Sequence, residues 1–396
     1  MPETVVDADD FPIENLPFGV VRPRSGSGEG AARVVVRIGD SVLDLAAAGI
    51  EPELTAQPAL NALLASGRGS EVRRRAGELL SSHEDGGGAL LPLAGVEVLL
   101  PVAVGDYVDF YSSIHHATNL GRLFRPDSDP LLPNWRCLPV GYHGRAGTIV
   151  VSGTAVPRPH GLVLGEDGVP RLGPSRRLDI ELEVGFVVGR GGTRLRPDDA
   201  ADHVFGVVLL NDWSARDIQA YEYQPLGPHL GKSFATTISP WVVTLDALTP
   251  FLVAPPEQDP VPDPYLQASG LWGLDLSLGV DLNGTSICAT NFSSMYWTFA
   301  QQLAHMTVNG ATVRPGDLFG SGTVSGPTKG ERGSLVELSW GGREPFALDD
   351  GSTRTFLEDG DTVTLRGWCG GGGSDGDDRP RIGFGSAVGT IVPARS

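Results

Sequence analysis

The chain has 396 residues and a formal charge of −18, because 48 Asp and Glu residues outnumber 30 Lys and Arg residues. This acidity argues against nucleic acid and anionic membranes as partners. Three scattered cysteines match no metal-binding spacing, and no secretory signal or membrane-spanning run is evident, so we expect a cytoplasmic protein with no membrane partner.

The first hundred residues are typical of a small separate unit. Strands are expected at Arg33–Ile38 and Ser41–Leu45, followed by one helical region over residues 60–81. A glycine-rich segment at 84–88 has the composition of a linker, and a strand over residues 96–102 leads into the larger region.

From about residue 105, short apolar runs alternate with Gly and Pro turns. The chain contains 54 glycines and 31 prolines, so turns should be frequent and long helices few. This pattern is typical of a β sandwich, barrel or roll. One helix is expected from Ser293 to Val308, ending at Asn309-Gly310. The segment 370–378 is expected to be a solvated loop, with an acidic loop that helps to bind cations as the alternative. Strands are expected at 148–152, 182–188, 204–210, 241–244, 274–282, 335–340 and 362–366.

Two glutamates, Glu181 and Glu183, lie in a stretch that alternates polar and apolar residues over 177–186. Alternation predicts a half-buried strand with both carboxylates on one face, roughly 7 Å apart. Like charges at this separation repel, so either water screens them or a cation lies between them. A solvated strand face is the commoner explanation of such a pair.

Two further acids point to the cation. Asp109 lies in a segment rich in polar residues, and Asp212 directly follows an apolar strand, at the rim of a sheet where sites are common. With the two glutamates they would offer oxygen ligands that suit Ca²⁺ or Mg²⁺, with Mn²⁺ as a substitute, and zinc is disfavoured. Nearby Arg216 and Lys232 would offset the excess negative charge.

Several motifs occur in one order along nearly the whole chain. They include Asp109-Phe-Tyr-Ser-Ser113, His116-Ala-Thr-Asn119, Leu138-Pro-Val-Gly-Tyr-His-Gly-Arg145, Asn211–Gln219 and Gly231-Lys-Ser-Phe234. This ordered set resembles the fumarylacetoacetate hydrolase family. The resemblance implies a mainly β homodimer. Each chain would have a small N-terminal SH3-like β-barrel domain over residues 1–103, followed by a large catalytic mixed β-roll or sandwich domain with few helices over residues 104–396.

The resemblance also implies the role of each site residue. His116 would be the general base, oriented by Glu337, and Arg216, Gln219 and Lys232 would stabilise developing negative charge. Substrate contacts would come from Tyr111, Arg125, Tyr142, Gln219, Tyr223 and Thr323. A calcium site would use Asp109, Glu181, Glu183 and Asp212, and a second ion, typically Mg²⁺, would lie by Asp212, Lys232 and Thr236.

The activity that the resemblance implies is metal-dependent hydrolysis of a carbon–carbon bond. The substrate would be 4-fumarylacetoacetate, a small dianionic 1,3-diketone, and the products fumarate and acetoacetate, in the last step of tyrosine and phenylalanine catabolism. A histidine suits removal of a proton from water, and a metal suits a diketone. Two departures from the family pattern are a second histidine, His115, beside the base, which offers an alternative base, and the composition of residues 327–333.

Two other functions stay open. A related family member could hydrolyse or decarboxylate an acylpyruvate or another 2-oxo acid, although such proteins are generally shorter. A non-catalytic, calcium-stabilised β protein would account for the carboxylates but would leave His116, Glu337 and Arg216 unexplained.

Overall fold

The computed structural model describes residues 10–25, 28–82, 88–371 and 379–395. The expected linker at 84–88 and the expected acidic loop at 370–378 lie largely outside these residues. Within the described ranges, no helix has the length and apolar character needed to cross a bilayer.

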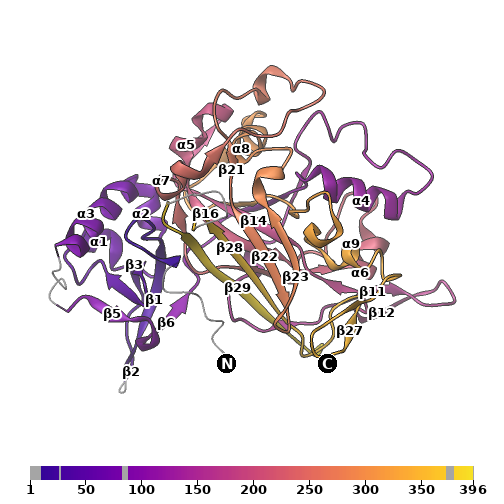
Figure 1. Ribbon diagram of the computed structural model, residues 1–396, viewed down its shortest axis with the longest axis horizontal. Coiled ribbons are helices and arrows are strands. Elements are labelled where there is room, and N and C mark those ends of the chain that lie inside the picture. The colour runs from indigo at the N-terminus through magenta and orange to yellow at the C-terminus, as the bar shows by residue number, and fades with distance from the viewer. Residues whose placement is uncertain (1–9, 26–27, 83–87, 372–378, 396) are drawn as a thin grey trace.

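The N-terminal region is a half-barrel sheet with three helices, seen as the indigo and purple lobe of Figure 1. The sheet order is β2-β1-β3-β4-β5, with β6 beside β1. The expected single helix over 60–81 is wrong, because Gly67 takes a left-handed φ of 68° that ends α2. The elements are β1 (Phe18–Ser25), β2 (Gly28–Glu29), β3 (Arg33–Ile38), β4 (Ser41–Asp44), α1 (Pro52–Thr55), α2 (Asn61–Ser66), α3 (Gly69–Ser81), β5 (Leu90–Pro92) and β6 (Val96–Leu99).

The larger region is built on two sheets. The eight-stranded sheet has the order β8-β7-β25-β14-β16-β18-β9 with β19 beside β16, and the five-stranded sheet has the order β10-β29-β28-β22-β23. The strands of the first sheet are β7 (Tyr107–Phe110), β8 (Gly141–His143), β9 (Ile149–Val151), β14 (Leu182–Val188), β16 (Val204–Asp212), β18 (Thr236–Ile238), β19 (Val243–Thr244) and β25 (Leu318–Gly320). Those of the second are β10 (Val156–Pro157), β22 (Ser277–Leu282), β23 (Thr285–Asn291), β28 (Thr362–Cys369) and β29 (Ile382–Val392).

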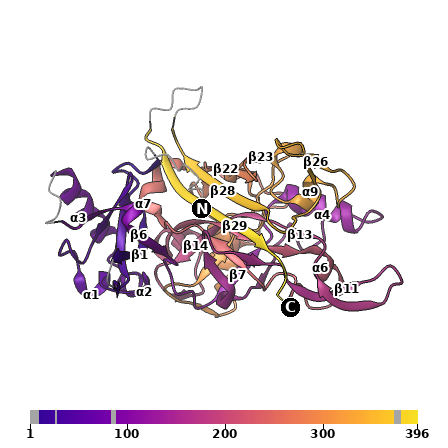
Figure 2. The same ribbon diagram turned by 90° about the horizontal axis from the view of Figure 1, so that it is seen from below.

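Short helices and two-stranded ladders connect these sheets. The helices are α4 (Ile114–Phe124), α5 (Ala200–His203), α6 (Arg216–Glu222), α7 (Leu245–Leu248), α8 (Phe299–Thr307) and α9 (Leu335–Leu338). The ladders pair β11 (His160–Leu164) with β12 (Pro170–Pro174), β13 (Leu178–Asp179) with β17 (Ser214–Ala215), β15 (Gly192–Thr193) with β24 (Thr312–Val313), β20 (Leu252–Val253) with β21 (Gly273–Leu274), and β26 (Phe346–Ala347) with β27 (Thr353–Arg354). The β11–β12 hairpin projects from the body in Figure 2.

The central strands β14 and β16 are covered on both faces. Phe186 and Leu209 belong to a core shared with β22 and β28, whereas Val187 and Val208 belong to a second core shared with the N-terminal lobe. All seven residues of β14 are buried, so the expectation of a half-exposed strand is wrong. Polar and apolar residues do alternate along this segment, but the face of the strand that carries the polar residues packs against protein instead of water.

The two lobes are joined by backbone as well as by side chains. Phe18 of β1 and Val242 exchange two hydrogen bonds, with N···O distances of 3.0 and 2.7 Å. The Phe18 ring also packs on Phe205, with the ring centroids 5.4 Å apart. The N-terminal lobe therefore closes one side of the central sheet.

Two other expectations are corrected. Residues 335–338 form the helix α9 instead of a strand, because backbone N–H groups at its start bind the carboxylate of Asp179. The late helix α8 begins at Phe299, several residues after the expected start, where Thr298 and Gln301 form a capping box. The strands β1 and β29 were not expected at all.

Candidate active site

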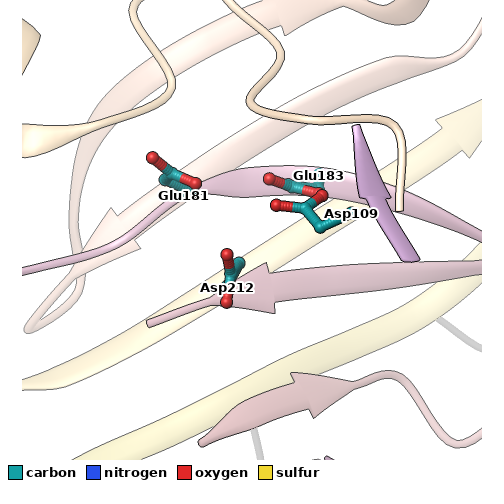
Figure 3. A group of neighbouring side chains, drawn as sticks. All are labelled: Asp109, Glu181, Glu183 and Asp212. Atoms are coloured by element: carbon teal, nitrogen blue, oxygen red, sulfur yellow. The ribbon is translucent and has the colours of Figure 1, made fainter. Parts of the chain in front are cut away.

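Four carboxylates from three strands meet in the interior of the larger region. Asp109 lies in β7, Glu181 and Glu183 lie just before and within β14, and Asp212 ends β16; Figure 3 shows them facing one another. One oxygen of each lies within 4.8 Å of the others, and no residue of the four is more than 5% exposed. The acids expected from sequence to converge do so.

A glycine allows two of these acids to approach. Gly320 of β25 lies between the strands of Asp109 and Glu183 in the sheet. A Cβ atom at this position would lie 2.8 Å from Asp109 Oδ1 and 2.8 Å from Glu183 Oε2. Any larger side chain would therefore occupy space that the carboxylates use.

The electrostatics of the cluster favour a cation. Burial, followed by repulsion between neighbouring acids, raises the pKa of Asp109 and of Glu183 well above their ordinary values. Among the described residues, Asp109 Oδ1, Glu183 Oε1 and Asp212 Oδ1 are buried without a hydrogen-bond partner. Unpartnered, mutually repelling oxygens with no sulfur or nitrogen ligand fit a hard divalent cation.

Two basic side chains border the cluster. Lys232 Nζ donates to Asp212 Oδ2 at 2.6 Å and also to Glu181 Oε2, and Arg216 lies 2.8 Å from Glu181 Oε1. Burial alone would discharge these bases, but the adjacent carboxylates raise the pKa of both above their ordinary values. Burial acts to raise the pKa of Glu181, but the charges of Lys232 and Arg216 outweigh it and hold this pKa well below its usual range. Tyr142 adds a hydrogen bond, donating to Asp212 Oδ2 at 2.8 Å.

A histidine–glutamate pair lies beside the cluster. His116, in the first turn of α4, is 1% exposed, and its Nδ1 lies 2.6 Å from Glu337 Oε2. Its other ring nitrogen, Nε2, lies 3.8 Å from Glu181 Oε1. It is His116, and not His115, that bonds to Glu337.

Glu337 fixes the protonation pattern of the pair. Burial acts to raise its pKa, but His116 together with hydrogen bonds from Asn119 and Ser334 lowers the pKa to about 2. The ionised carboxylate can only accept, so the proton of a neutral imidazole lies on Nδ1. This leaves a lone pair on Nε2, directed toward the acids.

Asp179 is a site residue that sequence reasoning missed. It is fully buried, and its Oδ2 accepts from Arg216 Nε at 2.7 Å. The same carboxylate accepts from the backbone N–H groups of Leu335 and Val336 at the start of α9. A signal was present, because Asp179, Glu181 and Glu183 recur with a period of two.

Other missed residues support Glu337. Asn119 donates to Glu337 Oε1 at 2.8 Å, and Ser325 and Ser334 donate to Oε2 at 2.9 and 2.7 Å. Asn119 was signalled by its place in the His116-Ala-Thr-Asn119 motif, whereas no local pattern distinguishes the two serines from other loop serines.

The remaining candidates fall into three groups. Tyr111 packs edge-on against His116, Gln219 accepts from Arg216, and Thr236 pairs with Asp212 in the sheet. Thr323 Oγ1 and Arg125 Nε are buried and, within the described chain, unpartnered. Tyr223, by contrast, is 37% exposed and accepts a hydrogen bond from Gln224, so it is not brought to the acids by a contact.

The chain is similar to known proteins along almost its whole length. Residues 14–101 match the family model "Fumarylacetoacetase N-terminal", and residues 107–392 match "Fumarylacetoacetate (FAA) hydrolase C-terminal". Fumarylacetoacetase of Arabidopsis thaliana is 48% identical over 414 residues, covering 97% of this chain and 96% of that protein. The human fumarylacetoacetase is 46% identical over 419 residues, covering 98% of each chain.

A solved structure shows the same fold at lower identity. The fumarylacetoacetate hydrolase of Exiguobacterium antarcticum superposes with a TM-score of 0.55 at 18% identity, covering 96% of this chain and 100% of that one. The similarity of fold therefore extends beyond recognisable sequence similarity.

Proposed function

The chain belongs to the fumarylacetoacetase family, and from this premise we infer that it hydrolyses the carbon–carbon bond of 4-fumarylacetoacetate to give fumarate and acetoacetate. The observation that carries this inference is the position of His116 Nε2, 3.8 Å from Glu181 Oε1 at the edge of the acid cluster. A proton acceptor thus lies beside a cluster suited to hold a cation and, with it, a diketone.

The residues divide the reaction between them. His116 Nε2 takes a proton from a water molecule while the oxygen of that water bonds to the substrate carbonyl carbon next to the alkene. The carbon–carbon bond then breaks, and its electron pair passes to the acetoacetate carbon as an enolate. That carbon takes up a proton from the His116 imidazolium, which restores the neutral base, and the fumaric acid formed loses its own proton to water. Glu337 keeps Nδ1 protonated throughout and balances the charge on the imidazolium.

Three donors would meet the negative charge that develops. Arg216 and Lys232 are buried and charged, and Gln219 is held against Arg216 by a hydrogen bond of 3.2 Å. Fixed donors in a dry site stabilise an oxyanion more than they would in water. Tyr111, Arg125, Tyr142, Tyr223 and Thr323 are the proposed substrate contacts, and the buried, unpartnered atoms of Arg125 and Thr323 support two of them.

Asp109, Glu181, Glu183 and Asp212 would hold the cation, which we propose to be Ca²⁺, with Mn²⁺ as a possible substitute. A second ion, Mg²⁺, would lie by Asp212, Lys232 and Thr236. When bound, a divalent cation polarises carbonyl oxygens and favours the enolate form of a diketone. The donor set, which is made of oxygen atoms alone, supports a hard divalent cation of this kind.

The test is turnover by the purified protein with Ca²⁺ or Mg²⁺. We expect loss of diketone absorbance with stoichiometric release of fumarate, and we expect His116→Ala to keep its metal content while losing on the order of 10³-fold in kcat. Turnover of an acylpyruvate with no turnover of 4-fumarylacetoacetate would overturn the inference. Full activity of His116→Ala would overturn the assignment of the base.

The cellular setting belongs to the same proposal. The substrate places the reaction at the last step of tyrosine and phenylalanine catabolism, and we propose a cytoplasmic homodimer. We also propose that residues 1–103 are the N-terminal domain and residues 104–396 the catalytic domain. Two family models that meet between residues 101 and 107 support this division.

A further inference from the structure

We infer that Asp179 is a positioning residue that fixes the Arg216 side chain and the helix carrying Glu337 in one common geometry. The inference rests on the proposed function for its kinetic consequences. Among the described residues, no hydrogen bond or ion pair of the Asp179 carboxylate reaches the acid cluster or His116, so its effect must pass through other residues.

The Asp179 carboxylate accepts four hydrogen bonds from the described residues. Asp179 Oδ1 accepts from the N–H groups of Ile180 and Leu335, both at 2.7 Å. Asp179 Oδ2 accepts from Arg216 Nε at 2.7 Å and from the Val336 N–H at 3.0 Å. Both oxygens therefore link separate parts of the chain, and the group is 0% exposed, so water offers no substitute partner.

These contacts close a ring around the reacting groups. On one arm, Asp179 holds Arg216, which lies 2.8 Å from Glu181 Oε1. On the other, Asp179 holds the start of α9, whose Glu337 bonds to His116, and His116 Nε2 lies 3.8 Å from the same oxygen of Glu181. Because both arms end at one atom, moving Asp179 would shift the base and the arginine relative to each other.

The informative substitution is Asp179→Asn. The amide has the shape of the carboxylate, but its NH₂ group must face two of the four N–H donors, whichever way the side chain is turned. Misplacement of catalytic groups by about 1 Å costs roughly 100-fold in rate, so we expect kcat to fall by about 10- to 100-fold.

Asp361→Asn is the matched control. Asp361 is 2% exposed and accepts from two nitrogens of Arg354, from the Asn283 amide and from the Glu358 N–H. Like Asp179 it is buried and accepts four hydrogen bonds that include an arginine nitrogen and a backbone N–H group, but none of these partners belongs to the candidate active site. We expect this variant to lose stability comparably and to keep its kcat.

Double-mutant cycles separate positioning from general destabilisation. If Asp179 acts through both arms, Asp179→Asn should cost less activity in an Arg216→Ala background, and less in a Glu337→Gln background, than in the unsubstituted protein, because one of the two arms is already lost in each. Additive losses in either background would overturn the joining role. A loss of kcat in Asp179→Asn no larger than in Asp361→Asn would also overturn it.

Hydrogen exchange gives a readout that does not depend on turnover. Peptides that cover residues 333–340 should exchange faster in Asp179→Asn than in the unsubstituted protein, and at an unchanged rate in Asp361→Asn. Unchanged exchange in Asp179→Asn would overturn the inference. If the unsubstituted protein fails to cleave the diketone, the proposed function fails, but this measurement still tests whether Asp179 holds α9.

Discussion

At the scale of single residues, the acid cluster combines repulsion with a lack of partners. Asp109 and Glu183 carry raised pKa values, and each has an oxygen without a hydrogen bond in the described part of the chain. Such groups cost folding free energy unless a cation or protons neutralise them. The cation site and the stability of the protein should therefore be linked.

This linkage predicts the behaviour of Glu183→Gln. Without metal, the variant should melt at a higher temperature than the unsubstituted protein, because one of two repelling carboxylates is removed. Calcium at a hundred times its Kd should stabilise the unsubstituted protein by about 2.7 kcal/mol, and the variant much less at the same concentration. Scanning calorimetry with and without Ca²⁺ measures both effects. Glu78→Gln, at an exposed ion pair, controls for the change in charge. If Ca²⁺ raised the melting temperature of the two variants equally, the prediction would be contradicted.

Glu337 predicts a pH dependence of stability. Its pKa of about 2 lies below the ordinary 4.5, so its ionised form stabilises the folded state above pH 4.5, and that stabilisation is lost as pH falls from about 4.5 toward 2. Other acids also titrate in this range, so the relevant quantity is the difference between the unsubstituted protein and Glu337→Gln. Urea unfolding at several pH values should show that difference shrinking in this window. A difference independent of pH would rule out the lowered pKa.

At the scale of elements, strand β25 is what lets two neighbouring strands bring their acids together. Gly320 has no side chain where one would meet Asp109 and Glu183. Its role is thus steric, since its φ does not lie in the left-handed region.

Gly320→Ala should consequently weaken calcium binding by at least tenfold and reduce activity to a similar extent at limiting metal. The added methyl group would lie 2.8 Å from each of two carboxylate oxygens, closer than a contact allows. Gly279→Ala in β22 is the matched control, because the nearest atom to its added Cβ lies at 3.6 Å. Isothermal titration calorimetry with Ca²⁺ compares the two, and equal affinities would refute the steric role.

Elements also show where sequence patterns were insufficient. Leu335-Val-Glu-Leu338 has the composition of a strand, but Asp179, 156 residues from Leu335, bonds its first N–H groups and selects a helix. The long strand β29 was hidden by glycines such as Gly389, where a Cβ would meet Trp213 at 2.3 Å. Both outcomes depend on contacts between distant parts of the chain.

At the scale of the whole molecule, the two lobes share one hydrophobic core. Phe18 and Leu43 of the N-terminal lobe pack in the same cluster as Val208 and Leu210 of β16. The boundary near residue 103 therefore separates two sets of helices and strands, but the hydrophobic core continues across it. Neither lobe has its apolar face covered without the other.

Phe18→Ala should destabilise the entire protein and not one lobe. Loss of a fully buried phenylalanine costs about 3–5 kcal/mol, and the shared core should keep unfolding cooperative. All seven tryptophans follow residue 103, and although Trp241 packs among residues of the N-terminal lobe, their fluorescence reports mainly on the larger lobe, while circular dichroism reports on both. The two unfolding curves should coincide and shift together. Phe124→Ala, at a half-exposed side chain, should shift neither, and a separate early transition by circular dichroism would contradict the shared core.

The sequence was most informative where chemistry and local pattern coincide. Glu181 and Glu183 were selected by their strand period, Asp109 and Asp212 by their ligand type and their positions in a polar segment and after an apolar strand. The mainly β fold was predicted from short apolar runs between turns. The burial of β14 on both faces could not be predicted, because its polar positions face other acids instead of solvent. Asp179 had the right spacing, but its partners lie in α6 and α9, which no local pattern places nearby.

Asp179, Glu181 and Glu183 follow one another at every second position of the chain. Asp179 contacts Arg216 and α9, Glu181 contacts Arg216 and Lys232, and Glu183 lies against Gly320. One inserted or deleted residue between 179 and 183 would turn some of these carboxylates to the opposite face. We therefore expect the length of this segment to be invariant among relatives, while the turn between β11 and β12 gains and loses residues freely. The site therefore depends on the two-residue spacing of these carboxylates as much as on their chemistry.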